Sequence, residues 1–151
     1  MTVLYNTIVL IHVMSAILGM GPGFVMIYIV KQAKTMTELR HAYAIRNRIH
    51  IFVMVGGSLL LITGLLMGWL RPYLFHQGWY VISLILFLVA LAFGPVILSP
   101  KSKPIKQLLK EETSEEIPPV YDQYSKSLFF FERVENVLFL IIISLMILKP
   151  F

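Results

Sequence analysis

The sequence predicts an all-α membrane protein in which four transmembrane helices pack as an antiparallel bundle. Of its 151 residues, 58% are hydrophobic and only 14% are charged, whereas soluble domains average about 45–50% apolar and about 25% charged residues. The apolar residues gather in four runs of 20 or more, and a helix needs about 20 residues to cross a hydrocarbon core of ~30 Å. We therefore expect one transmembrane domain over residues 1–151.

The four expected spans are residues 4–30, 49–70, 79–98 and 129–148. Strands are excluded because only helices and closed barrels satisfy backbone groups in lipid, and the runs lack the alternation of barrel strands. The first run is longer than the apolar part of a signal peptide, about 7–15 residues, so we expect it to be retained. The proline-containing connector at 99–128 is either a solvated linker or holds a short amphipathic helix on the membrane surface, with Ile105, Leu108 and Leu109 on one face.

Lysine and arginine residues predict the orientation. Segments 31–48 and 99–128 carry ten of them, whereas segment 71–78 and the C-terminal tail contribute only Arg71 and Lys149. Because cytoplasmic loops are rich in Lys and Arg, we expect a multi-pass protein of the cytoplasmic (plasma) membrane, with both termini outside. An aromatic belt at the outer interface would comprise Tyr5, Trp69, Tyr73, Trp79 and Tyr80. This placement accounts for the net charge of +5, so the expected partner is the lipid bilayer and not nucleic acid.

Small residues predict where the helices approach each other. Ser15, Gly19 and Gly23 recur at spacing four in the first span, and the second span has Gly57, Gly64 and Gly68. Such stripes let two helix backbones come close in lipid, where van der Waals packing drives helix association. The prolines of Gly21-Pro22-Gly23 and Gly94-Pro95 are expected to bend their helices or to free a carbonyl group.

His12 is the ionisable residue expected deepest in the outer half of the membrane. It lies eight residues into the first run, at ~12 Å depth by helical rise, and it precedes the small-residue stripe on the same face. A neutral imidazole there either ligates haem iron or another metal, passes a proton, or packs against a neighbouring helix through a hydrogen bond. A haem b at His12 would have an outer-half partner such as Met67, an oxygen ligand, or an open position on its other side.

A polar cluster is expected at the cytoplasmic ends of the second and fourth spans. It comprises Arg46, Arg48, His50, Glu132, Glu135 and Asn136. The acids would neutralise the bases at the membrane boundary and also suit the positive end of a helix dipole. His50 with either acid is alternatively a proton-relay or cation-handling site. His50 and His12 differ in level by ~25 Å, so they should not bind one haem; His76 is expected in the outer loop and His41 in solvent.

Three short motifs carry a resemblance to a known family. Ile11-His12-Val13, the run from Leu61 to Gly68, and Gly78-Trp79 resemble the bacterial membrane proteins of domain-of-unknown-function family 2269. More distantly, the chain is similar to haem-b-dependent protoporphyrinogen oxidases and to CopD-type copper-resistance proteins. The likeness to the oxidases implies His12 as a haem ligand, although Ser83 stands where those enzymes commonly have a lysine.

Two functional hypotheses follow from the sequence. The first is a small integral membrane protein with an accessory or permeation-linked role, and the second is a haem-b-binding redox protein centred on His12. The absence of cysteine excludes disulfides and thiolate metal sites. The sequence leaves open whether the protein is an enzyme, which substrate it takes and whether it forms a homo-oligomer.

Overall fold

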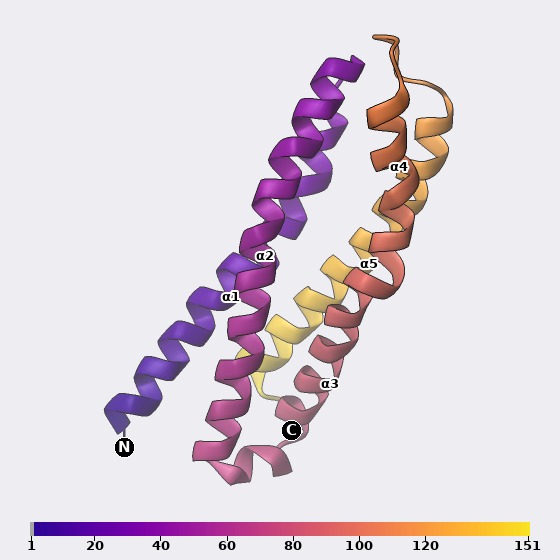
Figure 1. Ribbon diagram of the computed structural model, residues 1–151. Helices are drawn as coiled ribbons and strands as arrows, with labels where there is room; N and C mark the ends of the chain where they lie inside the picture. Colours follow the sequence, from indigo (N-terminus) through magenta and orange to yellow (C-terminus); the bar gives the residue numbers. More distant parts are fainter. Residues whose placement is uncertain (1) are drawn as a thin grey trace.

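The structure is a computed structural model that describes residues 2–151, and these residues confirm the all-α prediction (Figure 1). Two long helices come first, α1 (Thr2–Lys31) and α2 (Met36–Leu70). The short 3-10 helix η1 (Pro72–His76) then leads into α3 (Gly78–Phe93). A π-helical turn, η2 (Gly94–Leu98), joins α3 to α4 (Ser99–Glu111), and α5 (Val120–Leu148) ends the chain.

Three helices of the described residues are long and apolar enough to cross a membrane: α1, α2 and the continuous helix Gly78–Glu111. The helix α5 differs because Glu132, Arg133 and Glu135 occupy its middle. The apolar stretch that follows them, residues 137–148, is only ~18 Å long at 1.5 Å per residue. The predicted fourth crossing is therefore not established by length and composition.

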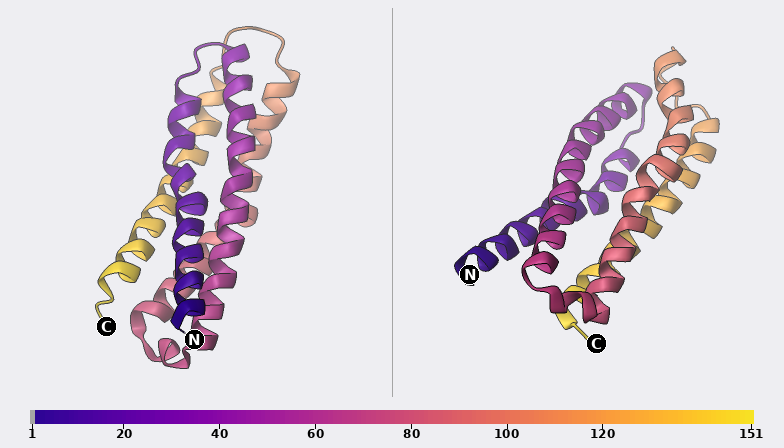
Figure 2. Two further views of the ribbon diagram at one scale, coloured as in Figure 1. Left: turned by 90° about the vertical axis from the view of Figure 1, so that its left-hand side faces the viewer. Right: turned by 60° about the horizontal axis from the view of Figure 1, so that its bottom comes forward.

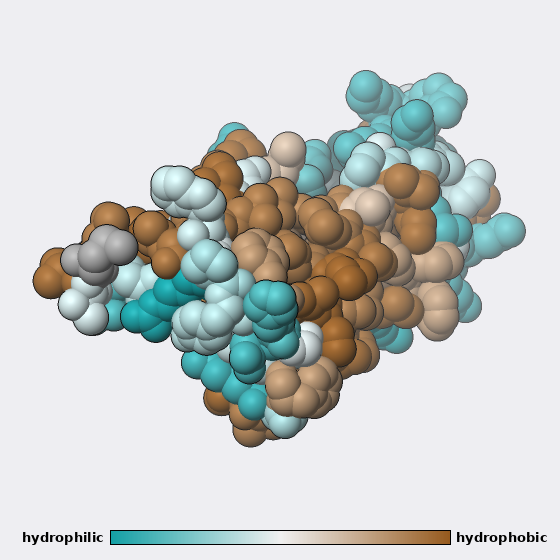
Figure 3. All heavy atoms as spheres, turned by 90° about the horizontal axis from the view of Figure 1, so that it is seen from below, coloured by the Kyte–Doolittle hydropathy of each residue, from teal (hydrophilic) through white to brown (hydrophobic). Residues whose placement is uncertain are grey.

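The helices associate as two pairs (Figures 1 and 2). The helix α1 packs mainly on α2, whereas α5 packs mainly on α3 and α4. Both chain termini and the α2–α3 connection lie at one end of the molecule, and the α1–α2 and α4–α5 connections lie at the other. Figure 3, seen from the end with the termini, shows hydrophobic side chains over most of the flanks and hydrophilic ones gathered toward the two ends.

The helix α2 begins well before its apolar run. Thr35 caps it by accepting a hydrogen bond from the Glu38 amide at 3.2 Å, and the Glu38 carboxylate accepts one from the Lys34 amide at 2.7 Å. This reciprocal arrangement resembles a capping box, which stabilises helix starts. With 35 residues, α2 is ~52 Å long and extends past a hydrocarbon core of ~30 Å.

The connector expected at 99–128 begins with a helix that continues α3. The turn η2 absorbs Pro95, which has no N–H to donate, and the chain then proceeds directly into α4. Ile105 of α4 is fully buried, so this face of the helix packs against the rest of the protein. Arg40 of α2 satisfies the end of α4 by donating to the carbonyls of Leu109 at 3.0 Å and Glu112 at 2.5 Å.

The closest helix crossing joins α1 to α2 at Gly19 and Gly56. A Cβ atom built on Gly19 would lie 2.8 Å from the Gly57 nitrogen, and one built on Gly56 would meet the backbone of Gly19 and Ser15. The seam expected on the first span is thus used, and on the second span the closest approach is at Gly56, which the expected stripe did not include. Gly57 faces Leu91, and Gly64 faces His12.

Candidate functional site

An apolar cavity of about 430 Å³ lies between α1, α2, α3 and α5 in the half of the molecule that holds the termini. We call it the His12 cavity; its wall includes His12, Met20, Gly64, Tyr80, Ser83 and Met146. Ile17 and Ile147 also line it and are 60% and 72% exposed, so the cavity opens sideways between α1 and α5. In a membrane this opening would face lipid.

A hydrogen bond to Thr63 orients the His12 ring. The Nδ1 atom of His12 lies 2.7 Å from the Thr63 hydroxyl oxygen. That hydroxyl donates its only proton to the Leu59 carbonyl at 2.6 Å, so it can only accept from His12. The network therefore assigns the proton to Nδ1 and leaves Nε2 with a free lone pair. A neutral imidazole with free Nε2 can accept a hydrogen bond or ligate a metal.

Two more polar side chains, both from α3, line the His12 cavity. Tyr80 is 2% exposed and donates from its hydroxyl to the Gly64 carbonyl at 2.8 Å. It is therefore a buried wall residue, and its expected place in the aromatic belt is wrong. Ser83 is 0% exposed, and its hydroxyl has no hydrogen-bond partner among the described residues. Buried hydroxyl groups almost always have a partner, so Ser83 marks this wall as unusual.

The structure does not bring Met67 into the His12 cavity. Met67 packs in a separate cluster with Leu74 and Tyr80, close to η1. The methionines that line the cavity are Met20 of α1 and Met146 of α5. A thioether partner for His12 would therefore come from one of these two.

The other histidines lie outside this cavity. His50 is exposed near the middle of α2, His76 is exposed in η1, and His41 is exposed in the first turns of α2. Of the histidines, only His12 lines the cavity. This placement agrees with the expected separation of His12 from His50, and His76 does not fold inward.

Within the expected cytoplasmic cluster, the structure joins Arg46 to Glu132. The two form an ion pair through Arg46 Nη2 and Glu132 Oε1, and their side chains are only 13% and 7% exposed. Arg46 also lies over the Tyr43 ring, with its guanidinium carbon 5.6 Å from the ring centroid. The pair connects α2 to α5, so it links the two helix pairs of the fold.

The remaining members of that cluster have different surroundings. Arg48 and His50 are exposed, and Glu135 is half-buried one turn beyond Glu132. The Asn136 amide donates to the Gly23 carbonyl of α1 at 3.1 Å, which ties α5 to the helix segment that follows Pro22. The cluster therefore divides into a buried ion pair, a helix-to-helix amide contact and exposed charges.

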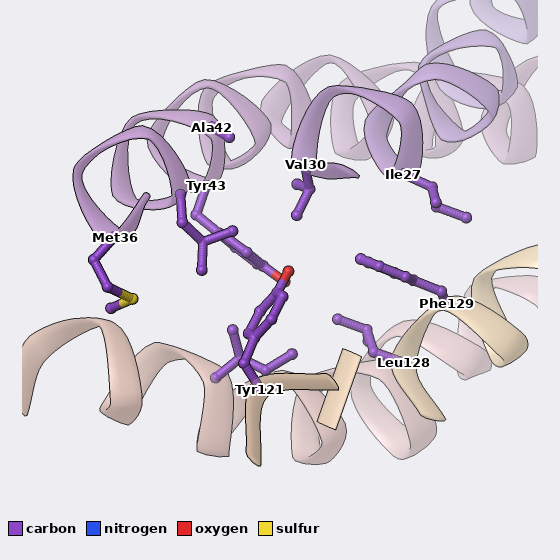
Figure 4. Close-up of a cluster of buried hydrophobic side chains, with 10 residues drawn as sticks. Ile27, Val30, Met36, Ala42, Tyr43, Tyr121, Leu128 and Phe129 are labelled. Atoms are coloured by element: carbon purple, nitrogen blue, oxygen red, sulfur yellow. The ribbon is translucent and has the colours of Figure 1, made fainter. Parts of the chain in front are cut away.

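Through the contact of Arg46 with the Tyr43 ring, the ion pair adjoins a hydrophobic core. Figure 4 shows side chains of this core. We call this group the polar-end core, and its buried members are Ile27, Val30, Met36, Leu39, Ala42, Tyr43, Ile105, Tyr121, Leu128 and Phe129. The hydroxyls of Tyr43 and Tyr121 point toward each other at 3.4 Å. Burial raises the pKa of Tyr121 above its usual value, so this hydroxyl stays protonated at neutral pH.

Sequence reasoning missed several of these contributors. Thr63 was not expected to orient His12, although a hydroxyl residue beside a glycine in the second span is visible in the sequence. Gly56 adjoins Gly57, and neighbours on a helix point about 100° apart, so the pattern could not choose between them. The capping sequence Thr35-Met36-Thr37-Glu38 could have located the true start of α2.

A comparison with known proteins adds one finding. A family model described as predicted integral membrane protein (DUF2269) matches residues 6–150. No curated protein matches the chain, and no solved structure matches it. The matched range includes every residue of the His12 cavity and of the ion pair.

Proposed function

From the premise that the chain belongs to the DUF2269 family of predicted integral membrane proteins, we propose that it is an accessory membrane protein that binds a lipid-soluble molecule. The observation that carries the proposal is the His12 cavity. Its volume of about 430 Å³ lies in the range of ligand pockets, about 300–1,000 Å³. Like such pockets, it combines mostly apolar walls with a few convergent polar groups.

The cavity favours an uncharged ligand that arrives from the bilayer. None of the described residues that line it is a lysine, arginine, aspartate or glutamate. A charged group of a ligand would find no oppositely charged partner in this wall, so burying that group in the cavity would cost free energy. The exposed residues Ile17 and Ile147 at its opening provide a path from lipid without passage through water.

The proposal is tested by the small molecules that purify with the protein. Wild type and Ala16→Trp, which fills the cavity, would be isolated in native lipid particles and their extracts compared by mass spectrometry. Leu10→Trp is the control, because Leu10 is 57% exposed on the same helix and lies outside the cavity. We expect a compound that is retained by wild type and Leu10→Trp and depleted in Ala16→Trp; identical extracts would contradict the proposal.

Haem b is the second candidate ligand, and the free Nε2 of His12 favours it. Imidazole is a common axial ligand for haem iron, and thioethers serve as the opposite ligand in some cytochromes. Here Met20 and Met146 are the lining thioethers. The two propionates of haem count against it, since the cavity wall offers no cation, which is why a neutral ligand is preferred.

Absorption spectroscopy separates the two candidates. Protein purified in mild detergent from haem-replete cells would show a Soret band if it binds haem b, and His12→Ala would remove that band while the protein remains inserted. We expect wild type without a Soret band. A band that depends on His12 would establish haem as the ligand in place of an uncharged molecule.

We further propose that α5 is a fourth crossing and that both termini lie outside the cytoplasmic membrane. The Trp79 amide at the start of α3 donates to the Phe151 carbonyl at 3.0 Å, so the C-terminus lies beside the α2–α3 turn. Glu132, the most buried acid of α5, is paired with Arg46. The ten-to-two distribution of Lys and Arg supports the orientation.

Cysteine labelling in intact cells tests this topology, because the chain has no native cysteine. His76→Cys should react with an impermeant maleimide from outside, whereas Ser114→Cys should react only after permeabilisation. A C-terminal tag should be accessible from outside as well. An internal C-terminus with His76→Cys outside would show that α5 does not cross.

A further inference from the structure

We propose that the His12 cavity takes a lipid-soluble phenol, the chemical class that includes alkylphenols and quinols. Its hydroxyl would donate a hydrogen bond to His12 Nε2 and accept one from the Ser83 hydroxyl. This inference rests on the proposed function and names the ligand class of the same cavity.

His12 supplies the acceptor. Its Nδ1 proton is committed to Thr63, whose own proton is committed to the Leu59 carbonyl. His12 lines the cavity, and in this tautomer its second ring nitrogen, Nε2, accepts and cannot donate. A ligand that satisfies this nitrogen needs a hydroxyl or amine proton, whereas a pure hydrocarbon or an ether would leave the nitrogen unpaired.

Ser83 supplies the donor, and comparison with other serines in the helices shows why. Ser15, Ser58 and Ser144 each donate to the carbonyl four residues earlier, at 2.7, 2.9 and 2.8 Å. Ser83 does not, and its buried hydroxyl stays unpartnered among the described residues. An unsatisfied buried hydroxyl costs about 1–3 kcal/mol. Ser83 is 0% exposed, so a ligand oxygen that displaced the side chains packed over its hydroxyl would remove that cost.

The cavity walls favour a phenol among hydroxyl compounds. Phe24 and Phe87 line the cavity together with aliphatic side chains. An aromatic ring of the ligand would be stabilised by edge-to-face contacts with these phenylalanine rings. A phenol has a pKa near 10, so it is neutral at physiological pH and yet a good donor to imidazole. A tail attached to its ring could leave through the opening between α1 and α5, which Ile17 and Ile147 border.

Three probes of nearly equal size separate the contribution of the ligand hydroxyl to binding from that of the apolar parts. Retention of 4-nonylphenol, 4-nonylanisole and nonylbenzene would be measured on wild type in lipid nanodiscs, with retention by empty nanodiscs subtracted. The anisole keeps the oxygen but has no proton to donate. We expect the phenol to bind about five- to tenfold more tightly than the anisole, as one net hydrogen bond would give.

Matched variants assign the two contacts. Ser83→Ala and His12→Phe should each lower phenol binding toward that of the anisole. Ser144→Ala is the control, because it removes an identical hydroxyl that lies on α5 outside the cavity, and it should leave binding unchanged. The wild-type comparison of the three probes does not depend on the folding of any variant.

The outcomes separate this inference from the proposed function. Preference for the phenol that requires Ser83 and His12 supports both. Equal binding of all three probes to wild type overturns the phenol inference and leaves an apolar cavity that binds ligand. Retention no greater than that of empty nanodiscs for all three probes overturns both.

Discussion

The helices pack differently at the two ends of this bundle. At the end away from the termini, α2, α4 and α5 contribute Met36, Ile105 and Leu128, all 0% exposed. Arg40 caps α4 there, and Glu115 accepts from the Met36 amide at 2.9 Å through its carbonyl. At the end with the termini, α1, α2, α3 and α5 leave a cavity of about 430 Å³ between them.

The contrast follows from the surroundings of each end. The polar-end core lies largely outside the predicted spans, where water drives apolar side chains together. In lipid that driving force is missing, and helices associate through small residues and hydrogen bonds. The membrane half can therefore keep an open cavity at little cost, since lipid can cover its walls. The end with the polar-end core is therefore tightly packed, whereas the end with the His12 cavity leaves space between its helices.

Breaking the buried ion pair should give the largest effect at the end with the polar-end core. Glu132→Leu leaves the Arg46 guanidinium without its carboxylate, and losing one partner of a buried pair costs about 3–5 kcal/mol. The double variant Arg46→Leu/Glu132→Leu should regain much of this loss, since an apolar pair needs no charge compensation. Unfolding in nanodiscs or mixed micelles measures each free energy, with Arg48→Leu as the exposed control. Strictly additive single effects would count against the contact.

Truncating matched isoleucines compares the two ends directly. Ile105→Ala opens a void in the polar-end core, where the side chain is fully buried, and should cost about 2–4 kcal/mol. Ile143→Ala enlarges the His12 cavity, which Ile143 lines, and lipid can occupy the added space. We expect a cost below about 1 kcal/mol for this change. Equal losses in the same unfolding assay would show that both ends are packed alike.

Adding a methyl group at the helix crossing should have a smaller effect. Gly56→Ala places a Cβ against the backbone of Gly19, which cannot yield as a flexible side chain would. Such overpacking costs about 1–3 kcal/mol. Gly94→Ala is the control, because nothing lies within 4 Å of its Cβ position. If thermal stability falls equally in both variants, the close crossing of α1 and α2 is wrong.

Apolar runs in the sequence predict that the chain is helical, but they do not predict where its helices begin. The all-α class follows from them directly, because lipid permits few alternatives. Helix boundaries do not, since α2 begins at Met36 and α5 at Val120, in polar segments that hydropathy does not recognise. Capping by Thr35 and burial of Ile105 extend these helices, and burial depends on neighbours distant in sequence.

The sequence predicted one residue of the candidate site but not the residues around it, because their contacts depend on how the helices pack. His12 stands out because an ionisable residue is rare within a span. Its partner Thr63 and the unpartnered Ser83 depend on helix rotation, which a run of apolar residues does not fix. Tyr80 shows the error that results: its position near a span end suggested the interface, but α3 turns it toward the Gly64 carbonyl.

The smallest expected effect concerns that tyrosine and tests the register of α2 against α3. Tyr80→Phe keeps the ring and removes one hydrogen bond, from the hydroxyl to the Gly64 carbonyl at 2.8 Å. That carbonyl lies within α2 and can keep its partner along the helix, so no acceptor is left unsatisfied. We expect a loss of about 0.5–1 kcal/mol, as for hydrogen bonds between membrane helices. Tyr73→Phe, at a side chain that is 55% exposed, should change nothing. A loss above about 2 kcal/mol for Tyr80→Phe would mean that the cavity wall is as tightly coupled as the ion pair, and the contrast between the two ends would fail.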